Sequence, residues 1–232
     1  MAQPTLLLLA AFILTCQPLV SEAGDVFTGF QIDNRSQYFG YFGVRTPLLQ
    51  TSGGPDLFVQ TLAAGIGYRF KSDGQLLDAN VQFIVQALGI TKTVGSWILS
   101  AQAGPQLRRI EEQRLSRNAS IEHQIGAYGQ VDALYSHEKG SVHVIGSYAD
   151  LDNFFWGRLR GKLLTHQSTA RCSTYVGWDV AGMGNADSRA VQTGPLVEVP
   201  IEKVFLLAKG GYQYGTSFHG SVYGGIEIYF PF

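Results

Sequence analysis

The sequence is poor in charge and in long apolar segments. Charged residues make up 15% of the 232 residues, whereas an ordinary soluble domain carries about 25%. The formal net charge is only −1, so nucleic acid is not an expected partner. Apolar residues are spread along the chain, and none of their runs reaches the roughly 20 residues that a membrane-spanning helix needs. The composition therefore disfavours a soluble domain, a nucleic-acid-binding protein and a helical membrane protein.

The first 23 residues have the pattern of a secretory signal peptide. Residues 6–14 are a run of apolar side chains, long enough for the apolar core of a signal and too short to cross a bilayer. Small residues at Ser21 and Ala23 then fit the positions that a signal peptidase reads. We predict cleavage after Ala23, which leaves residues 24–232 as one exported domain.

Cysteine is almost absent, with two residues in the whole chain. Cys16 offers a competing interpretation, a lipidated N-terminus, although Thr15 is a poor residue directly before such a site. After cleavage at Ala23, Cys172 is the sole cysteine. The exported domain must therefore fold without an internal disulfide.

Glycine, aromatic residues and two-residue periodicity are plentiful. The chain holds 28 glycines and 12% aromatic residues. The clearest alternation is at the C-terminus, where one strand face carries Val222, Gly224, Ile226, Ile228, Phe230 and Phe232. Glu227 and its tyrosine and glycine neighbours lie on the other face, and this alternation is typical of a β-strand.

The same alternation recurs in four other segments. The apolar sets are Ile125, Ala127, Gly129, Val131 and Ala133; Ala79, Val81, Phe83 and Val85; Phe155, Gly157, Leu159, Gly161 and Leu163; and Thr174, Val176, Trp178 and Val180. Periodicity alone fits a soluble sandwich or a membrane barrel with its apolar face toward lipid. The signal peptide, the terminal aromatic residue and the scarcity of charge favour an all-β fold, a single antiparallel transmembrane β-barrel.

We predict about twelve strands and almost no helix. Their expected ranges are 25–33, 38–47, 57–70, 76–88, 96–107, 124–136, 141–149, 154–164, 171–183, 189–200, 204–214 and 221–232. An even number of strands returns both chain termini to the periplasmic side. Tight turns are then expected at 138–140 and 202–203, and a long outer loop, with at most a short helix, between residues 108 and 124.

The last residues also predict how the barrel is assembled. Ile228, Phe230 and the terminal Phe232 alternate on one face, which resembles the signal that barrel-assembly machinery reads in outer-membrane proteins. We therefore expect an outer-membrane location, with membrane lipid and the assembly machinery as partners.

No catalytic or cofactor motif is present. The chain lacks a phosphate-binding loop, a paired-cysteine metal site and a Gly-x-Ser-x-Gly sequence, so we expect no cofactor, no metal ion and no enzymatic activity. The alternative is a lipid-modifying barrel enzyme of the lipase or acyltransferase type. Its candidates are Ser141, His143 and Ser147, which share one strand face, although neighbours on one face are about 7 Å apart, too far for a direct hydrogen bond.

Charges on the predicted inner faces are the most informative polar residues. Arg158, Arg160 and Lys162 form a ladder on one strand, while the inner positions of other strands hold Asp132, Asp179, Glu198, Lys209 and Glu227. Interior charges must be paired or hydrated. We predict one network of Arg158, Arg160, Asp179, Asn185 and Glu198, with Asn185 able to cap a turn.

Two interpretations of this interior remain open. In the first, the salt-bridged side chains fill the barrel and hold it rigid. In the second, they line a polar pathway or a sugar-binding lumen, where Trp156, Tyr128 and Tyr175 would offer flat faces for stacking.

Two segments resemble the bacterial cellulose-biosynthesis protein BcsS. They are Ser147-Tyr-Ala-Asp-Leu-Asp-Asn-Phe-Phe-Trp-Gly-Arg-Leu-Arg-Gly161 and Gly177-Trp-Asp-Val-Ala-Gly-Met-Gly-Asn185, in which the matching places are Arg158, Arg160, Gly161, Gly177, Asp179, Gly184 and Asn185. The segments 27–30 and 38–41 resemble the first hairpin of that family more loosely. Asp179 stands where the family has Glu, and Trp178 where proline is common.

The resemblance implies an outer-membrane β-barrel that serves cellulose or exopolysaccharide biosynthesis or secretion. It also implies cellulose, or the cellulose synthase and export complex, as a partner. Composition and spacing by themselves indicate neither.

Overall fold

The structure, a computed structural model, describes residues 24–72, 75–114, 120–169, 172–216 and 218–232. The predicted signal peptide, residues 1–23, lies outside the described residues. Across the described ranges, no helix is long and apolar enough to cross a membrane. A single 3-10 turn, η1 (Leu151–Asn153), is the helical element of this part of the chain.

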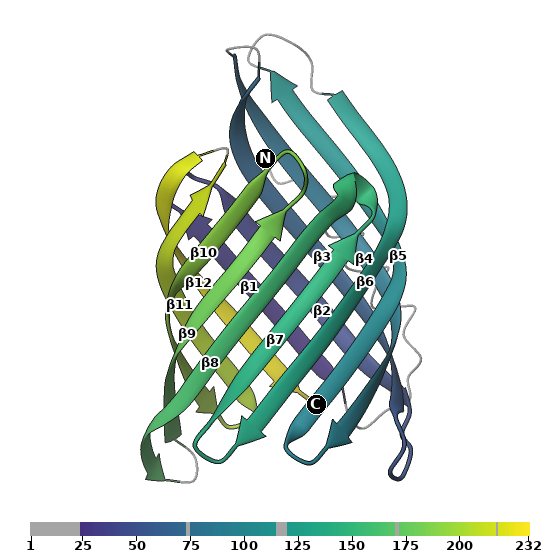
Figure 1. Cartoon of the computed structure of the whole chain (residues 1–232), viewed down its shortest axis with the longest axis vertical. Helices are drawn as coiled ribbons and strands as arrows, with labels where there is room; N and C mark the ends of the chain where they lie inside the picture. The colour runs from purple at the N-terminus through teal and green to yellow at the C-terminus, as the bar shows by residue number, and fades with distance from the viewer. Residues whose placement is uncertain (1–23, 73–74, 115–119, 170–171, 217) are drawn as a thin grey trace.

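Twelve strands make up nearly all of the fold, as the sequence predicts (Figure 1). They are β1 (Asp25–Asp33), β2 (Tyr38–Leu49), β3 (Asp56–Ser72), β4 (Gln75–Val94), β5 (Trp97–Arg114), β6 (Ser120–His137), β7 (Gly140–Ala149), β8 (Phe154–Thr169), β9 (Cys172–Gly184), β10 (Arg189–Ile201), β11 (Val204–Gly215) and β12 (Phe218–Pro231).

The sheet is antiparallel and closes into a barrel. Every strand pairs with its neighbours in sequence, and β12 returns to pair with β1. Two backbone hydrogen bonds of 2.7 Å between Gly24 and Phe232 complete the seam. Closure removes the free sheet edges that would otherwise leave backbone groups unpaired in lipid.

Because the number of strands is even, the start of β1 and the end of β12 lie at the same rim of the barrel. The two-residue turns after β6 and β10, at Glu138–Lys139 and Glu202–Lys203, lie at this same rim. Glu202 has a φ of 56°, the left-handed conformation that tight turns use. The predicted tight turns at 138–140 and 202–203 are therefore confirmed as turns.

Outward-facing positions are apolar on most strands. On β12 the outer side chains include Val222, Ile226 and Ile228, while Tyr223 and Glu227 point inward. The predicted parity also holds on β6, β8 and β9, where the outer faces expose Val131, Leu159 and Trp178. The barrel thus presents an apolar exterior and a largely polar interior, the arrangement expected of a membrane barrel.

The predicted parity of β4 is wrong. Val85 is 0% exposed and faces inward, whereas Leu88, three residues further on, is 58% exposed on the outside. The apolar set from Ala79 to Val85 therefore packs inside the barrel. Gln86 on the outer face accepts a 2.8 Å hydrogen bond from Thr61 of β3, and this contact satisfies a polar group that the sequence pattern places inside.

The predicted long loop at residues 108–124 is also wrong in extent. The described residues on either side of 115–119 are strand, because β5 runs to Arg114 and β6 begins at Ser120. Arg109 and His123 are paired across these two strands. Strands β3 to β6 are 17, 20, 18 and 18 residues long and rise above the rest of the wall (Figure 1). Charged residues are compatible with strand there because such a segment extends beyond the roughly 9–11 residues that span a bilayer.

Candidate functional site

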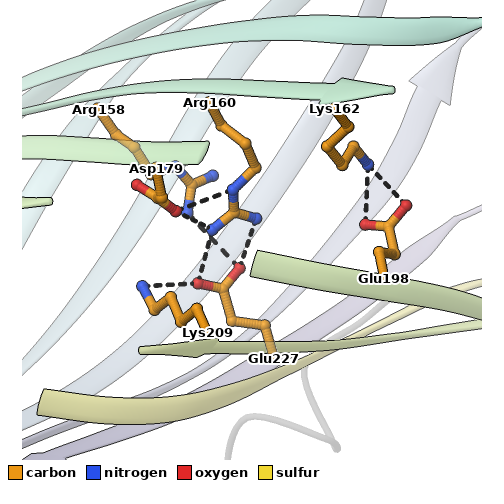
Figure 2. A network of polar contacts seen from close by, with 7 residues as sticks. All are labelled: Arg158, Arg160, Lys162, Asp179, Glu198, Lys209 and Glu227. Atoms are coloured by element: carbon orange, nitrogen blue, oxygen red, sulfur yellow. Dashed lines mark hydrogen bonds and ion pairs between the residues drawn. The ribbon is translucent and has the colours of Figure 1, made fainter. Parts of the chain in front are cut away.

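Five charged side chains from four strands meet inside the barrel, and we call them the lumen ion cluster. They are Arg158 and Arg160 of β8, Asp179 of β9, Lys209 of β11 and Glu227 of β12 (Figure 2). Alternation on β8 directs both arginines inward. The antiparallel register then sets Arg160 directly opposite Asp179 on β9, so the local sequence accounts for this pair.

Arg160 connects the two acids. Its Nε donates a 2.9 Å hydrogen bond to Asp179 Oδ2, and its Nη2 donates to the same oxygen. Its Nη1 and Nη2 donate to the two oxygens of Glu227 at 2.8 and 2.9 Å. This second contact is bidentate, the geometry in which a guanidinium binds a carboxylate most strongly.

Glu227 is the centre of the lumen ion cluster. Besides Arg160, its carboxylate contacts Lys209 Nζ at 3.0 Å and Arg158 Nη1 at 3.6 Å. The contact between Arg160 and Glu227 reaches from β8 to β12, which are not paired strands. It therefore spans part of the lumen and ties together two strands that are four positions apart in the wall.

A second ion pair lies beside the cluster. Lys162 Nζ donates hydrogen bonds of 2.6 and 2.8 Å to the two oxygens of Glu198 on β10. The structure thus places Glu198 in its own pair with Lys162, as Figure 2 shows, and not among the contacts of Arg158 and Arg160 predicted from the sequence. The reason is register: Lys162 lies two residues along β8 from Arg160, toward the part of β10 that holds Glu198.

Asn185 lies away from these charges. Its Oδ1 accepts hydrogen bonds of 3.0 and 2.9 Å from the backbone N–H groups of Asp187 and Ser188. These contacts lie within the turn between β9 and β10. The prediction that Asn185 belongs to the interior network is therefore wrong. Asn185 caps the turn, the other role considered for it.

The residues that the sequence argument left out of the network are Lys209 and Glu227. Both were expected on inner faces, and both do face inward. Strand adjacency could not reveal their contacts, because Glu227 reaches Arg160 across the lumen. The available signal was the charge count, since two arginines and one aspartate on β8 and β9 require another acid.

Buried apolar side chains lie next to the lumen ion cluster, because the register sets Leu196 opposite Lys209 and Leu207 opposite Glu227. Arg160 and Asp179 are 6% and 3% exposed, and Leu196 and Leu207, which also point inward, are each 2% exposed. Val85 is buried on the opposite wall. Buried ionic and apolar side chains thus lie side by side on this part of the inner wall.

Burial makes these charges interdependent. Ions removed from water are stable only when paired and hydrogen-bonded, and each acid of the cluster contacts at least one cation. The lumen ion cluster has three cations and two acids, whereas the pair of Lys162 and Glu198 is balanced. Loss of Arg160 would leave Asp179 buried without its cation, whereas Glu227 would keep Arg158 and Lys209.

The three aromatic candidates all belong to inner faces, but cations or amides already contact them. The Arg158 guanidinium lies 5.6 Å from the centre of the Trp156 ring, and Lys162 Nζ lies 6.0 Å from that of Tyr175. Tyr128 donates a 2.6 Å hydrogen bond to Gln130 Oε1. Tyr175 is therefore associated with the Lys162–Glu198 pair, while Tyr128 and Trp156 lie on β6 and β8.

The candidate residues for lipid chemistry also face the lumen. His143 is opposite Arg160 and Ser147 is opposite Trp156 in the register of β7 and β8. His143 Nε2 lies 3.4 Å from Asp132 Oδ1. In the part of the chain that the structure describes, no group of three or more His, Cys, Asp and Glu residues could hold a metal ion.

The predicted assembly residues lie at the end of the outer face. Ile228, Phe230 and Phe232 are all solvent-exposed, and the rings of Phe230 and Phe232 are stacked at 6.4 Å. Phe232 also supplies the backbone groups that pair with Gly24 at the barrel seam.

Comparison with known proteins identifies the fold. No family model matches the chain, and no curated protein matches it. Among solved structures, it is similar to the translocator domain of the autotransporter NalP from Neisseria meningitidis, with 13% identity, a TM-score of 0.56, and coverage of 98% of this chain and 95% of that one. The β domain of the Bordetella autotransporter Brka gives 12% identity and a TM-score of 0.54, covering 91% of this chain and 100% of the other.

A third barrel extends the comparison. The transport unit of the autotransporter AIDA-I from Escherichia coli has 10% identity and a TM-score of 0.55, and the match covers 94% of each chain. Identities this low concern the fold alone. The fold is that of an outer-membrane β-barrel, in agreement with the class predicted from the sequence.

Proposed function

We propose that this chain is a non-enzymatic component of the outer membrane that supports the production or secretion of cellulose or a related exopolysaccharide. Its barrel would act as a closed scaffold for an export apparatus and not as an open channel. The observation that carries the proposal is the lumen ion cluster, because its central residues are those on which the resemblance to BcsS rests.

Four of the positions that carry this resemblance lie side by side on β8 and β9, namely Arg160, Gly161, Gly177 and Asp179, whereas Asn185 caps the turn after β9. Arg160 and Asp179 are opposite each other, and the neighbouring pair is Lys162 with Gly177. A side chain at Gly177 would place its Cβ 2.1 Å from the carbonyl oxygen of Gly161, so Gly177 permits the close approach of β8 and β9. A motif whose members meet in this way supports a shared barrel design with the BcsS family.

The burial of the interior charges supports a scaffold over a channel. Leu196 and Leu207 are buried opposite Lys209 and Glu227 of the cluster, and the ion pairs of Glu227 tie β8 to β12 across the interior. A polysaccharide passing through would have to displace this packing and break buried ion pairs. The partner surface of a scaffold would then be at the rims or the outer wall.

Two measurements test the proposal. In a cellulose-producing host, deletion of the gene should lower cellulose yield, and the wild-type chain should restore it. Purified barrel in a planar bilayer should show no stable conductance steps. Normal yield in the deletion strain would refute the exopolysaccharide role, and reproducible steps in the bilayer would refute the closed scaffold.

The lipid-modifying enzyme is the alternative function, and its candidate residues allow a direct comparison. Ser147 and His143 face the lumen, whereas a membrane lipid would reach the outer wall. We therefore expect Ser147→Ala and His143→Ala to leave the envelope lipid profile and cellulose yield unchanged at equal protein level. A change of acylated lipid species with either variant, in a folded barrel, would favour the enzyme.

A further inference from the structure

One wall of the lumen presents an amide without a partner. Gln102 of β5 is 7% exposed, and both its Nε2 and its Oε1 are buried with no hydrogen-bond partner. Gln106, four residues further along β5, has a buried Oε1 in the same condition. Buried side-chain amides are nearly always hydrogen-bonded, so this arrangement calls for an explanation.

Gln102 belongs to a row of uncharged polar side chains that crosses four strands. The register pairs Gln102 with Gln130 of β6, Gln130 with Ser147 of β7, and Ser147 with Trp156 of β8. Adjacent members of such a row have Cβ atoms about 5 Å apart. We call Gln102, Gln130, Ser147 and Trp156 the neutral row.

The neutral row differs from the rest of the interior in charge and in exposure. It carries no ionisable group, whereas the neighbouring position on β8, Arg158, belongs to the lumen ion cluster. Gln130, Ser147 and Trp156 are only half-buried although they face inward. Solvent therefore reaches these three side chains from within the barrel, while the Gln102 amide beside them is buried.

The chemistry of the neutral row fits the hydroxyl groups of a sugar. A primary amide offers a donor and an acceptor side by side, and a hydroxyl group can be both acceptor and donor, so an unpaired amide is complementary to a vicinal diol. The half-buried Trp156 ring, which the Arg158 guanidinium approaches to 5.6 Å, adds aromatic surface, and ligand sites commonly combine such surface with a few placed polar groups.

We propose that the neutral row is a binding site for an uncharged glycan segment, in which Gln102 pairs with two neighbouring hydroxyl groups and Trp156 stacks on the sugar ring. The choice of a β-1,4-linked glucan as the glycan rests on the proposed function. The site itself rests on Gln102 and the row around it. It would hold the end of a glycan on the lumen wall beside Arg158 of the lumen ion cluster.

Fluorescence of Trp156 gives a direct test. The chain has three tryptophans, and Trp97 and Trp178 are exposed on the outer wall. In a Trp97→Phe, Trp178→Phe background, the full barrel in detergent micelles is titrated with cellotetraose. We expect a saturable change in emission, and about a tenfold weaker affinity for Gln102→Met, since loss of hydrogen bonds worth about 1.4 kcal/mol changes affinity tenfold.

The control is a glutamine that already has a partner. Gln192 on the far wall accepts a 2.9 Å hydrogen bond from Gln31, so Gln192→Met should leave the affinity for cellotetraose unchanged. Thermal unfolding provides a second readout. Gln102→Met should raise the melting temperature of the empty barrel, because it removes a buried polar group that has no partner.

The outcomes separate the site from the proposed function. Unchanged emission of the wild-type barrel, equal affinity of Gln102→Met, or a lower melting temperature of that variant would each overturn the glycan site. Reduced cellulose yield in the deletion strain with no cellotetraose binding would refute the site alone. Saturable binding with normal yield in that strain would support the site and refute the exopolysaccharide role.

Discussion

Arg160 is the residue on which the interior charges depend most. It contacts Asp179 and Glu227 together and is 6% exposed. Arg160→Ala would leave Asp179 without its cation and weaken the contacts of Glu227, so we expect a loss of stability of about 3–5 kcal/mol, the usual cost of breaking a buried ion pair. The measurement is the temperature at which the folded band of an unheated sample disappears from a detergent gel.

An exposed arginine serves as the matched control for this substitution. The side chain of Arg189, at the start of β10, is exposed, so Arg189→Ala should leave the unfolding temperature almost unchanged. If Arg160→Ala unfolds at the wild-type temperature, the acids are hydrated and the lumen ion cluster is not structural. Cellulose yield should fall with Arg160→Ala only as far as the amount of folded barrel falls.

At the residue scale, sequence could predict a pair but not a cluster. Arg160 and Asp179 were predicted as partners because they lie on inner faces of consecutive strands. Glu227 has the correct parity too, but its contact with Arg160 depends on the diameter of the closed barrel and on side-chain length. Those quantities are fixed only when all twelve strands are placed. For the same reason, the sequence does not predict that the Gln102 amide lacks a hydrogen-bond partner.

Among the elements, β12 provides the sharpest test of orientation. Ile226 is 53% exposed on the outer wall, in the middle of a strand whose next residue, Glu227, enters the lumen ion cluster. Ile226→Arg should cost about 2–4 kcal/mol in a lipid bilayer, since a cation near the bilayer midplane is poorly solvated. Urea unfolding in liposomes measures this difference directly.

Position along the barrel axis supplies the control for Ile226→Arg. Ile201 is also an exposed outer residue, but it ends β10 at the rim. Ile201→Arg should therefore cost only about 0–1 kcal/mol, because a charge near the interface remains hydrated. Equal costs at the two positions would mean that this part of the wall does not face lipid.

A second prediction at the element scale concerns the edge of β6 that is not paired with β7. Residues 120–126 pair with β5 but have no partner on β7, whose last pair joins Tyr128 to Ala149. Ala127 directs its N–H and C=O to Asp150 on that side, so alternation directs the backbone groups of residues 121, 123 and 125 the same way. In residue-resolved hydrogen exchange, these three amides should exchange faster than those of 122 and 124. Equal protection would mean that a further strand covers this edge.

The sequence predicts that β5 ends at residue 107 and that β6 begins at residue 124. Both strands extend further, and one physical reason explains both differences. The recognition of strands relied on an apolar outer face, which lipid imposes only within the bilayer. Above it, residues such as Arg109 and Glu111 can face water from either side of a strand. The parity error at β4 is related, because Ala79 to Val85 is apolar on the face that packs inside.

For the whole molecule, strand number, order and closure were predictable because they follow from few rules. Antiparallel strands joined by short connections pair with their sequence neighbours, and a membrane tolerates no open edge. These rules do not depend on the details of side-chain packing, which is why the barrel was predicted correctly where the interior was only partly so. The function of the lumen requires the experiments above, since the fold is shared by barrels of different activity.

The last prediction concerns the whole molecule and the role of Phe232 in assembly of the barrel. Its side chain is exposed next to that of Phe230, whereas its backbone makes both hydrogen bonds to Gly24 at the seam. Phe232→Gln keeps the backbone bonds and removes the aromatic ring. We therefore expect the purified variant to refold in detergent micelles with nearly wild-type stability. In cells, the amount of folded barrel in the membrane should fall severalfold, because the assembly machinery would no longer recognise the strand.

Phe232→Tyr, which keeps an aromatic ring, should restore assembly in cells, and deletion of Phe232 should impair both assays because it also removes the pairing with Gly24. The decisive comparison is between Phe232→Gln refolded in micelles and Phe232→Gln assembled in cells. If Phe232→Gln fails equally in micelles and in cells, the ring stabilises the closed seam and is not an assembly signal. If it assembles normally in cells, the machinery reads another part of β12, and Ile228 and Phe230 become the next positions to substitute.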